Sequence, residues 1–141
     1  MRILVTGGAG FIGSHLSQRL LGRGDEVVVL DNFNDYYDPA IKERNLSELG
    51  VPDGLTVVRG EILDQALLSS LFDTHRFDVI VHLAARAGAR PSLVDPILYE
   101  EVNCRGTLNL LEAARHHNID RFVFASSSSV YGNVKEIPFS E

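Results

Sequence analysis

Five short runs of apolar residues, rich in valine and isoleucine, alternate with segments of helical character. The runs occupy residues 3–5, 26–31, 55–58, 78–82 and 121–126. Each run is continuous rather than alternating with polar residues, and a strand of this kind is covered on both faces. Parallel strands joined by crossover helices meet this requirement. The sequence therefore predicts a doubly wound α/β fold, a five-stranded parallel sheet in the order 3-2-1-4-5 that is truncated after the fifth strand.

Helices are expected between the strands, at residues 11–21, 39–49, 64–72 and 95–117, with a long loop at 83–94. Gly22 and Gly24 end the first helix, and Pro39 opens the second in the way that a proline at the first helical position does. The whole chain, 1–141, is expected to form one domain.

A glycine-rich turn joins the first strand to the first helix. Its sequence is TGGAGFIG, which places Gly7, Gly10 and Gly13 in a G-x-x-G-x-x-G spacing. Gly7 allows the turn, Gly10 allows a pyrophosphate to approach the backbone, and Gly13 allows the helix to pack closely on the strand. The amides of Phe11, Ile12 and Gly13 would then donate to the pyrophosphate at the helix N-terminus.

An acidic residue stands where such a site requires one. Asp31 ends the second strand, 18 residues beyond Gly13, and is expected to bind the adenosine ribose hydroxyls. Its charge would repel a 2′-phosphate, and the Asn32-Phe33-Asn34 stretch supplies no arginine to offset it. A Rossmann-type site for NAD rather than NADP is therefore predicted.

Composition excludes several classes of partner. The net charge is −6 and there is no basic tract, which argues against nucleic acid and anionic membranes. The apolar runs are far shorter than the ~18 residues of a membrane span. The N-terminus shows no signal peptide and the single cysteine, Cys104, allows no internal disulfide, so a cytoplasmic location is expected. The histidines show no metal-ligand spacing, so no metal is expected.

Longer stretches resemble the extended short-chain dehydrogenase/reductase family, in its nucleotide-sugar epimerase and dehydratase branch. The matching stretches are TGGAGFIG at 6–13, DNFNDYYDP at 31–39, HLAARAGARPS at 82–92, EVNCRGTLNLL at 101–111 and ASSSSVYG at 125–132. The second and third are most similar to UDP-glucuronate 4-epimerases, and UDP-glucose 4-epimerases are the near alternative.

The resemblance implies a reaction. The enzyme would keep NAD bound, remove a hydride from C4 of a UDP-sugar and return it to the opposite face of a 4-keto intermediate. A tyrosine from a Tyr-x-x-x-Lys pair would act as base, assisted by a hydroxyl that aligns with Ser127. Ser128 and Arg90 are implied substrate contacts. Alternatively, the serines hydrogen-bond to their own backbone, and Arg90 is an ordinary surface residue.

The resemblance also implies further cofactor contacts. Glu61 stands where the family usually has aspartate, so the adenine contact is expected to pass to the backbone of Ile62. Asn103 is expected near the nicotinamide ribose. The additional cofactor positions are Asn32, Ile62, Leu83, Ala84, Ala85, Asn103 and Ser126. His82 is expected to be a core histidine with hydrogen-bond partners, and Cys104 a small buried residue.

Tyr131 and Lys135 form a Tyr-x-x-x-Lys sequence but are not expected to be the catalytic pair. That pair works on a helix, where positions four apart share a face. Gly132 and Asn133 favour a turn here, and Pro138 follows. The catalytic pair and the sugar-binding part are therefore expected to lie outside the 141 residues, and the chain alone is expected to be inactive.

Three functions remain open at this point. The first is the NAD-binding portion of a UDP-sugar 4-epimerase. The others are a non-catalytic NAD-binding module or Rossmann fragment, and another nucleotide-sugar reductase or dehydratase. Ser128-Ser129 disfavours a dehydratase, in which Asp-Glu would be expected there. The resemblance implies homo-oligomerisation through the helix at 95–117.

Overall fold

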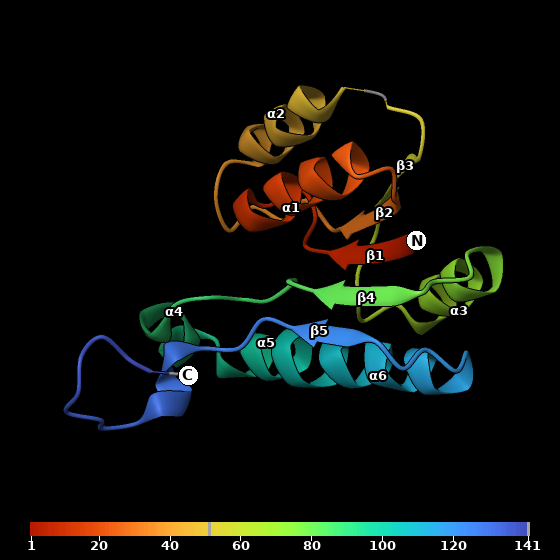
Figure 1. Ribbon diagram of the computed structural model, residues 1–141. Coiled ribbons are helices and arrows are strands. Elements are labelled where there is room, and N and C mark those ends of the chain that lie inside the picture. The colour runs from red at the N-terminus through yellow and green to blue at the C-terminus, as the bar shows by residue number, and fades with distance from the viewer. Residues whose placement is uncertain (51, 141) are drawn as a thin grey trace.

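The computed structural model describes residues 1–50 and 52–140 and contains a five-stranded sheet (Figure 1). Every neighbouring pair of strands is parallel, and the order is β3-β2-β1-β4-β5. The strands are β1 (Arg2–Thr6), β2 (Glu26–Asp31), β3 (Leu55–Arg59), β4 (Val79–His82) and β5 (Phe122–Phe124). The predicted doubly wound fold and strand order are therefore confirmed.

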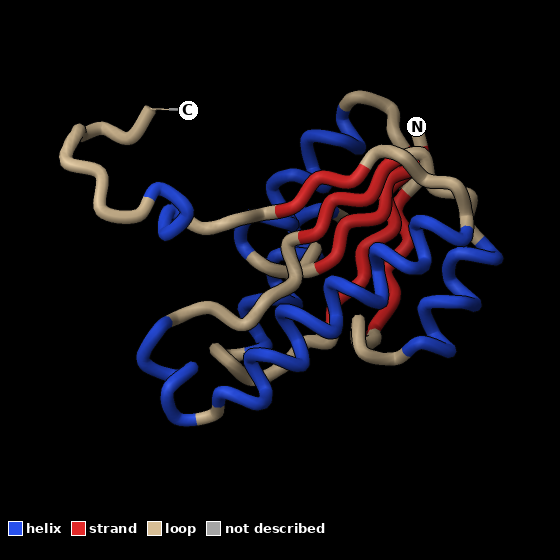
Figure 2. Tube along the Cα trace, turned by 90° about the horizontal axis from the view of Figure 1, so that it is seen from below, coloured by secondary structure: helices blue, strands red, loops and turns tan. Residues whose placement is uncertain are grey.

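Helices pack on both faces of the sheet (Figure 2). On one face, the apolar core includes residues of α1 (Phe11–Gly22) and α2 (Pro39–Leu49). On the other, it includes residues of α3 (Gln65–Thr74) and α6 (Gly106–His116). Successive strand residues divide between the two cores: Ile3 and Val5 belong to the first, and Leu4 to the second. This division explains why the strands are apolar at every position.

The segment after β4 contains more helix than the sequence indicated. The expected loop at 83–94 includes a short helix, α4 (Ala89–Val94), which follows Gly88 at a φ of 94°. The helix expected at 95–117 is instead α5 (Pro96–Glu100), a π-helical turn (Glu101–Arg105) and α6. Asp95 caps α5 by accepting a hydrogen bond from the Leu98 amide at 3.1 Å. A π-helical turn adds one residue to the helical repeat, which amphipathic spacing alone does not reveal.

Two smaller expectations were wrong. Cys104 is exposed, because the π-helical turn presents its side chain to solvent rather than to the core. β5 ends at Phe124, two residues before the expected end.

Leu108 and Leu111 lie exposed on α6, and the predicted self-association through this helix stays a prediction. Among the described residues, no helix has the length and apolar character needed to cross a membrane.

Candidate functional site

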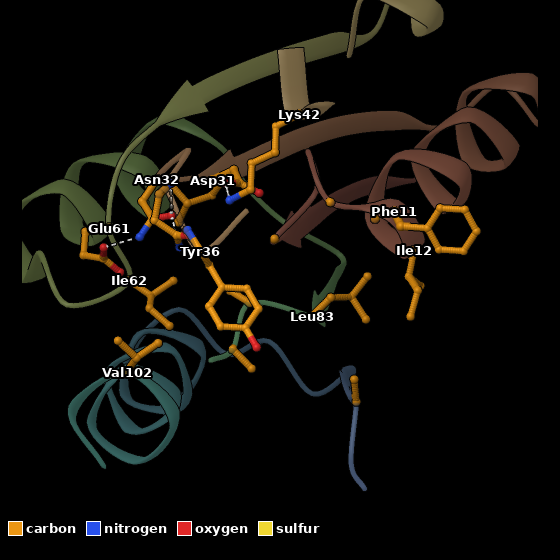
Figure 3. A pocket seen from close by; sticks show the side chains of 18 of the residues that line it. Phe11, Ile12, Asp31, Asn32, Tyr36, Lys42, Glu61, Ile62, Leu83 and Val102 are labelled. Atoms are coloured by element: carbon orange, nitrogen blue, oxygen red, sulfur yellow. Dashed lines mark hydrogen bonds and ion pairs between the residues drawn. The ribbon is translucent and has the colours of Figure 1, made fainter. Parts of the chain in front are cut away.

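A groove of about 340 Å³ opens at the carboxyl ends of β1, β2 and β4 (Figure 3). The sheet order reverses between β1 and β4, and open α/β sheets bind ligands at such a point. The volume lies within the range of small-molecule sites. Most of the predicted cofactor residues line it: Gly7, Gly10, Phe11, Ile12, Gly13, Asp31, Asn32, Ile62, Leu83, Ala84 and Ala85.

The glycine turn leaves no room for side chains. Gly7 has a φ of 67°, and a Cβ there would lie 2.8 Å from the Ala84 nitrogen. The Gly7 amide donates to the Leu30 carbonyl oxygen at 2.8 Å, which fixes the turn to the end of β2. A Cβ on Gly13 would overlap the Gly7 carbonyl oxygen and lie 2.6 Å from the Gly8 Cα. The turn and the first turn of α1 are thus in direct backbone contact.

The N-terminus of α1 lines the groove without a side-chain cap. Gly10 is the N-cap residue, and within residues 1–50 and 52–140 no side chain accepts a hydrogen bond from the first helical amides. Asn45 of α2 supports the turn from behind, donating from Nδ2 to the Ala9 carbonyl oxygen at 2.9 Å. Free amides and the helix dipole together favour an anion at this end of the groove.

Asp31 is buried at the end of β2, with 5% of its surface exposed. Oδ1 accepts from the Phe33 amide at 2.9 Å and from Lys42 Nζ at 3.1 Å, and Oδ2 accepts from the Ala9 amide at 3.1 Å. A carboxylate has about four acceptor positions. Among the described residues, one acceptor position of Asp31, on Oδ2, therefore has no hydrogen-bond donor.

Lys42 and Tyr37 line this end of the groove and were missed from the sequence. Pro39 opens α2, and Lys42 lies one turn later, which carries its side chain back to Asp31. Lys42 Nζ lies 5.4 Å from the centre of the Tyr37 ring. Burial raises the pKa of the Tyr37 hydroxyl, and the Asp31 charge raises that pKa further. The aromatic residues directly after β2 were the sequence feature that could have pointed to this part of the groove.

The side chains of Asn32 and Glu61 are hydrogen-bonded to each other. Asn32 donates from Nδ2 to Glu61 Oε2 at 2.5 Å, and its Oδ1 accepts from the Asn34 amide at 3.1 Å. Asn34 Oδ1 in turn accepts from the Tyr36 amide at 3.2 Å. These side chains fix the backbone between β2 and α2. Glu61 is thus held by Asn32, while Ile62 lies beside it in the groove (Figure 3).

Tyr36 crosses from this segment to the opposite wall of the groove (Figure 3). Its hydroxyl donates to the Ala87 carbonyl oxygen at 2.8 Å. Tyr99 of α5 donates to the same oxygen at 2.5 Å, but from the wall that already contains Ala87. Tyr36 therefore links the two walls directly, whereas Tyr99 donates within the wall that contains Ala87 and contacts the Tyr36 hydroxyl.

Asn103 does not line the groove, because its amide is paired with the backbone of Arg86. Oδ1 accepts from the Arg86 amide at 2.8 Å, and Nδ2 donates to the Arg86 carbonyl oxygen at 2.9 Å. The π-helical turn carries this side chain. The structure thus places Asn103 behind the segment that follows β4, where it holds the backbone in position.

His82 is a buried core histidine with both ring nitrogens hydrogen-bonded, as predicted. Thr107 donates to the Asn103 carbonyl oxygen at 2.7 Å, so it accepts from His82 Nε2 at 2.9 Å. Nδ1 then accepts from the Thr6 hydroxyl at 2.7 Å. This arrangement requires a neutral imidazole. Burial lowers the pKa of His82 to about 4, which agrees with that requirement.

The predicted substrate residues and Ser126 do not line the groove, although Ala125, directly before Ser126, does. Ser126, Ser127, Ser128 and Arg90 are exposed. Ser127 accepts from the Ser129 amide at 3.1 Å and so caps the 3-10 turn Ser128–Tyr131. Arg90 lies in the first turn of α4. The capping contact that the sequence allowed is thus present, and a substrate role for these residues stays a prediction.

Tyr131 and Lys135 share no helical face. The 3-10 turn ends at Tyr131, and Gly132 follows with a φ of 62°. The Tyr131 ring stacks on Phe139 with 4.8 Å between their centres. The pair therefore lacks the helical arrangement that the catalytic pair needs, as expected from the sequence.

A family model described as GDP-mannose 4,6 dehydratase matches residues 4–141. The chain belongs to this family. The extended short-chain dehydrogenase/reductase relationship predicted from the motifs is thereby confirmed. UDP-glucuronate 4-epimerase 1 from Arabidopsis thaliana is 49% identical to the chain over 140 residues. Protein CapI from Staphylococcus aureus is 43% identical over 140 residues.

Solved structures of family members share the fold. UDP-glucose 4-epimerase from Bifidobacterium longum, in complex with NAD⁺ and UDP, has a TM-score of 0.86 and 36% identity. The UDP-glucose 4-epimerase from Thermus thermophilus, in complex with NAD, has a TM-score of 0.84 and 42% identity. The matches cover 99% to 100% of this chain but only 32% of the Arabidopsis protein, 42% of CapI and 41% and 42% of the two structures.

Proposed function

We propose that this chain is the NAD-binding portion of a UDP-sugar 4-epimerase, most similar to the UDP-glucuronate 4-epimerases. One observation carries the proposal: a single groove has an uncapped helix N-terminus at one place and a buried carboxylate with one acceptor position at another. A dinucleotide presents both an anionic pyrophosphate and a ribose hydroxyl donor. The relatives in complex with NAD support the same assignment.

The lining residues fit such a cofactor. The amides of Phe11, Ile12 and Gly13 would donate to the pyrophosphate, and Asp31 Oδ2 would accept from the ribose. Ile62 would contact the adenine, and Leu83, Ala84 and Ala85 would flank the path to the nicotinamide. When bound, NAD would supply a hydride acceptor for the sugar carbon and return the hydride to it.

The chain would act on a sugar only with residues beyond those described. Ser127 would assist with its hydroxyl, with Ser128 and Arg90 toward the substrate, and the base would come from outside the 141 residues. Tyr131 and Lys135 are the one Tyr-x-x-x-Lys sequence present, and they lack the required geometry. Residues 1–141 would thus form the NAD-binding part of a larger catalytic unit.

The 141-residue chain is expected to bind NAD in isothermal titration calorimetry and to show no turnover of UDP-glucuronate or UDP-galactose. ADP-ribose should compete, because it carries both the pyrophosphate and the adenosine ribose. Adenosine should compete at least about tenfold more weakly, because it leaves the α1 amides without an anion. A folded chain that binds neither NAD nor ADP-ribose would contradict the proposed cofactor, and clear turnover would contradict the assignment of the base to other residues.

Tyr36→Phe is expected to accelerate NAD dissociation by about tenfold, since one hydrogen bond between the walls is lost. The measurement is a stopped-flow chase of bound NAD with excess ADP-ribose. Tyr99→Phe is the comparison variant, because its hydroxyl donates to the same carbonyl oxygen from the wall that contains Ala87. It also removes the contact between the Tyr99 and Tyr36 hydroxyls, so only a small acceleration, well below that of Tyr36→Phe, is expected. Equal acceleration in both variants would show that the link between the walls does not retain the cofactor.

A further inference from the structure

Lys42 is a cation inside the groove whose charge is matched by one carboxylate. Its Nζ donates to Asp31 Oδ1 at 3.1 Å, and both side chains are almost completely buried. The ammonium group has three donors, and Asp31 is its hydrogen-bond partner among the described residues. The remaining donors lie beside the Tyr37 ring and the groove. Lys42 thus stands next to the position proposed for the ribose hydroxyls.

The second cation near Asp31 is arranged differently. Arg59 pairs with Asp31 in the β2–β3 register, yet its guanidinium bonds to Glu43 at 2.7 Å and lies 3.9 Å from the Phe33 ring centre. Its side chain is 58% exposed. Arg59 is therefore engaged outside the groove, and Lys42 is the cation that lines it.

We propose that Lys42 is the specificity-determining partner of Asp31, neutralised by the carboxylate while NAD is the cofactor and able to bind a 2′-phosphate once the carboxylate is removed. The inference rests on the proposed NAD site. Asp31 accepts from a ribose hydroxyl, but a 2′-phosphate dianion offers no donor and meets a carboxylate in its place. Without Asp31, the same space holds a desolvated ammonium group with donors for phosphate oxygens.

The structure thereby changes the basis of the preference for NAD. The sequence directly after Asp31 contains no cation, which suggests a bare carboxylate that repels phosphate. In the folded chain, α2 supplies the cation from eleven residues further on. The charges of Asp31 and Lys42 therefore offset each other at the proposed ribose position, and the choice of cofactor depends on whether Lys42 holds the carboxylate or a phosphate.

The test compares NAD and NADP binding by calorimetry for wild type, Asp31→Ser, Lys42→Gln and Asp31→Ser/Lys42→Gln. Serine clears space for the phosphate, and glutamine can still donate to Asp31. Wild type is expected to bind NAD at least about a hundredfold more tightly than NADP. Asp31→Ser should bind NADP at least about tenfold more tightly than wild type does. The double variant should lose that gain, while Asp31→Ser/Arg59→Gln should keep it.

The outcomes separate this inference from the proposed function. Wild type that fails to bind NAD removes the proposed function. If wild type binds NAD but Asp31→Ser and Asp31→Ser/Lys42→Gln bind NADP with equal affinity, the role of Lys42 is overturned and the proposed function stands. The role of Lys42 is also overturned if the gain in NADP affinity persists in Asp31→Ser/Lys42→Gln but disappears in Asp31→Ser/Arg59→Gln.

Removal of Asp31 leaves Lys42 buried without its partner, so Asp31→Ser can fail to fold. Asp31→Asn, which keeps an acceptor for Phe33 and Lys42, provides a second variant. Thermal unfolding with added ligand then gives the answer, because a ligand stabilises the state that binds it. A rise in melting temperature with NADP that exceeds the rise with NAD supports the inference. No rise with NADP in either variant overturns it.

Discussion

Gly13→Ala is expected to destabilise the chain by about 3 kcal/mol or more and to abolish measurable NAD binding. The added methyl group would overlap the Gly7 carbonyl oxygen and lie 2.6 Å from the Gly8 Cα. Both neighbours are backbone atoms, so no side chain can move aside to relieve the overlap. The start of α1 would have to shift away from the turn, which displaces the amides proposed for the pyrophosphate.

Gly22→Ala is the control, because it lies at the other end of the same helix and its added Cβ would meet no atom within 4 Å. Helix propensity alone would make that variant equal to wild type or more stable by up to about 1 kcal/mol. Urea unfolding gives both free energies, and NAD titration gives the affinities. If Gly13→Ala and Gly22→Ala unfold with similar free energies, the close contact between turn and helix does not limit stability.

Acidification is expected to destabilise the chain through His82. The pKa of His82 is lowered from 6.5 to about 4 by burial, so between these values the unfolded state binds more protons than the folded state. Stability is therefore full above pH 6.5, falls as the pH falls, and loses about 2 kcal/mol by pH 5. Further loss continues until about pH 4, where the folded histidine itself takes up a proton.

The free energy of unfolding in urea, measured from pH 8 to pH 5, would reveal this dependence. His82→Gln removes the titrating group and should remove most of the slope, although it is less stable at pH 8 because one of the threonine contacts is lost. The pKa values of Asp25 and Glu112 are lowered by hydrogen bonds from the N-terminal ammonium group and Arg115, so these groups act below this window. A slope that persists unchanged in His82→Gln would exclude His82 as its source.

The fold was largely predictable because each strand is covered on both faces. Val28 and Leu30 contact one core and Val27 and Val29 the other, so a continuous apolar run is the pattern that a central parallel strand must have. The structure of the segment after β4 was only partly predictable. The helix expected at 95–117 begins and ends within one residue of its predicted bounds, but α4 lies inside the expected loop and the π-helical turn interrupts the helical repeat.

The glycine turn and Asp31 were predictable because their spacing is fixed by local geometry. Lys42 and Tyr36 were not, because their roles come from contacts with residues distant in the sequence. Lys42 meets Asp31 only because α2 folds back over the end of β2, and Tyr36 meets Ala87 51 residues further on. Asn103 illustrates the opposite case. The sequence predicted a polar role for it, but its partner, the Arg86 backbone, is determined by the fold.

The π-helical turn joins α5 and α6 into one continuous helix whose two halves contact different parts of the chain. Before it, Tyr99 contacts the segment after β4, and after it, Leu110 and Ala114 contact the core beside α3. The π-helical turn closes i→i+5 hydrogen bonds where an α-helix closes i→i+4, so Glu101–Arg105 accommodates one additional residue locally. The extra residue places Asn103 against the Arg86 backbone, while Leu110 and Ala114 of the following helix remain in the core.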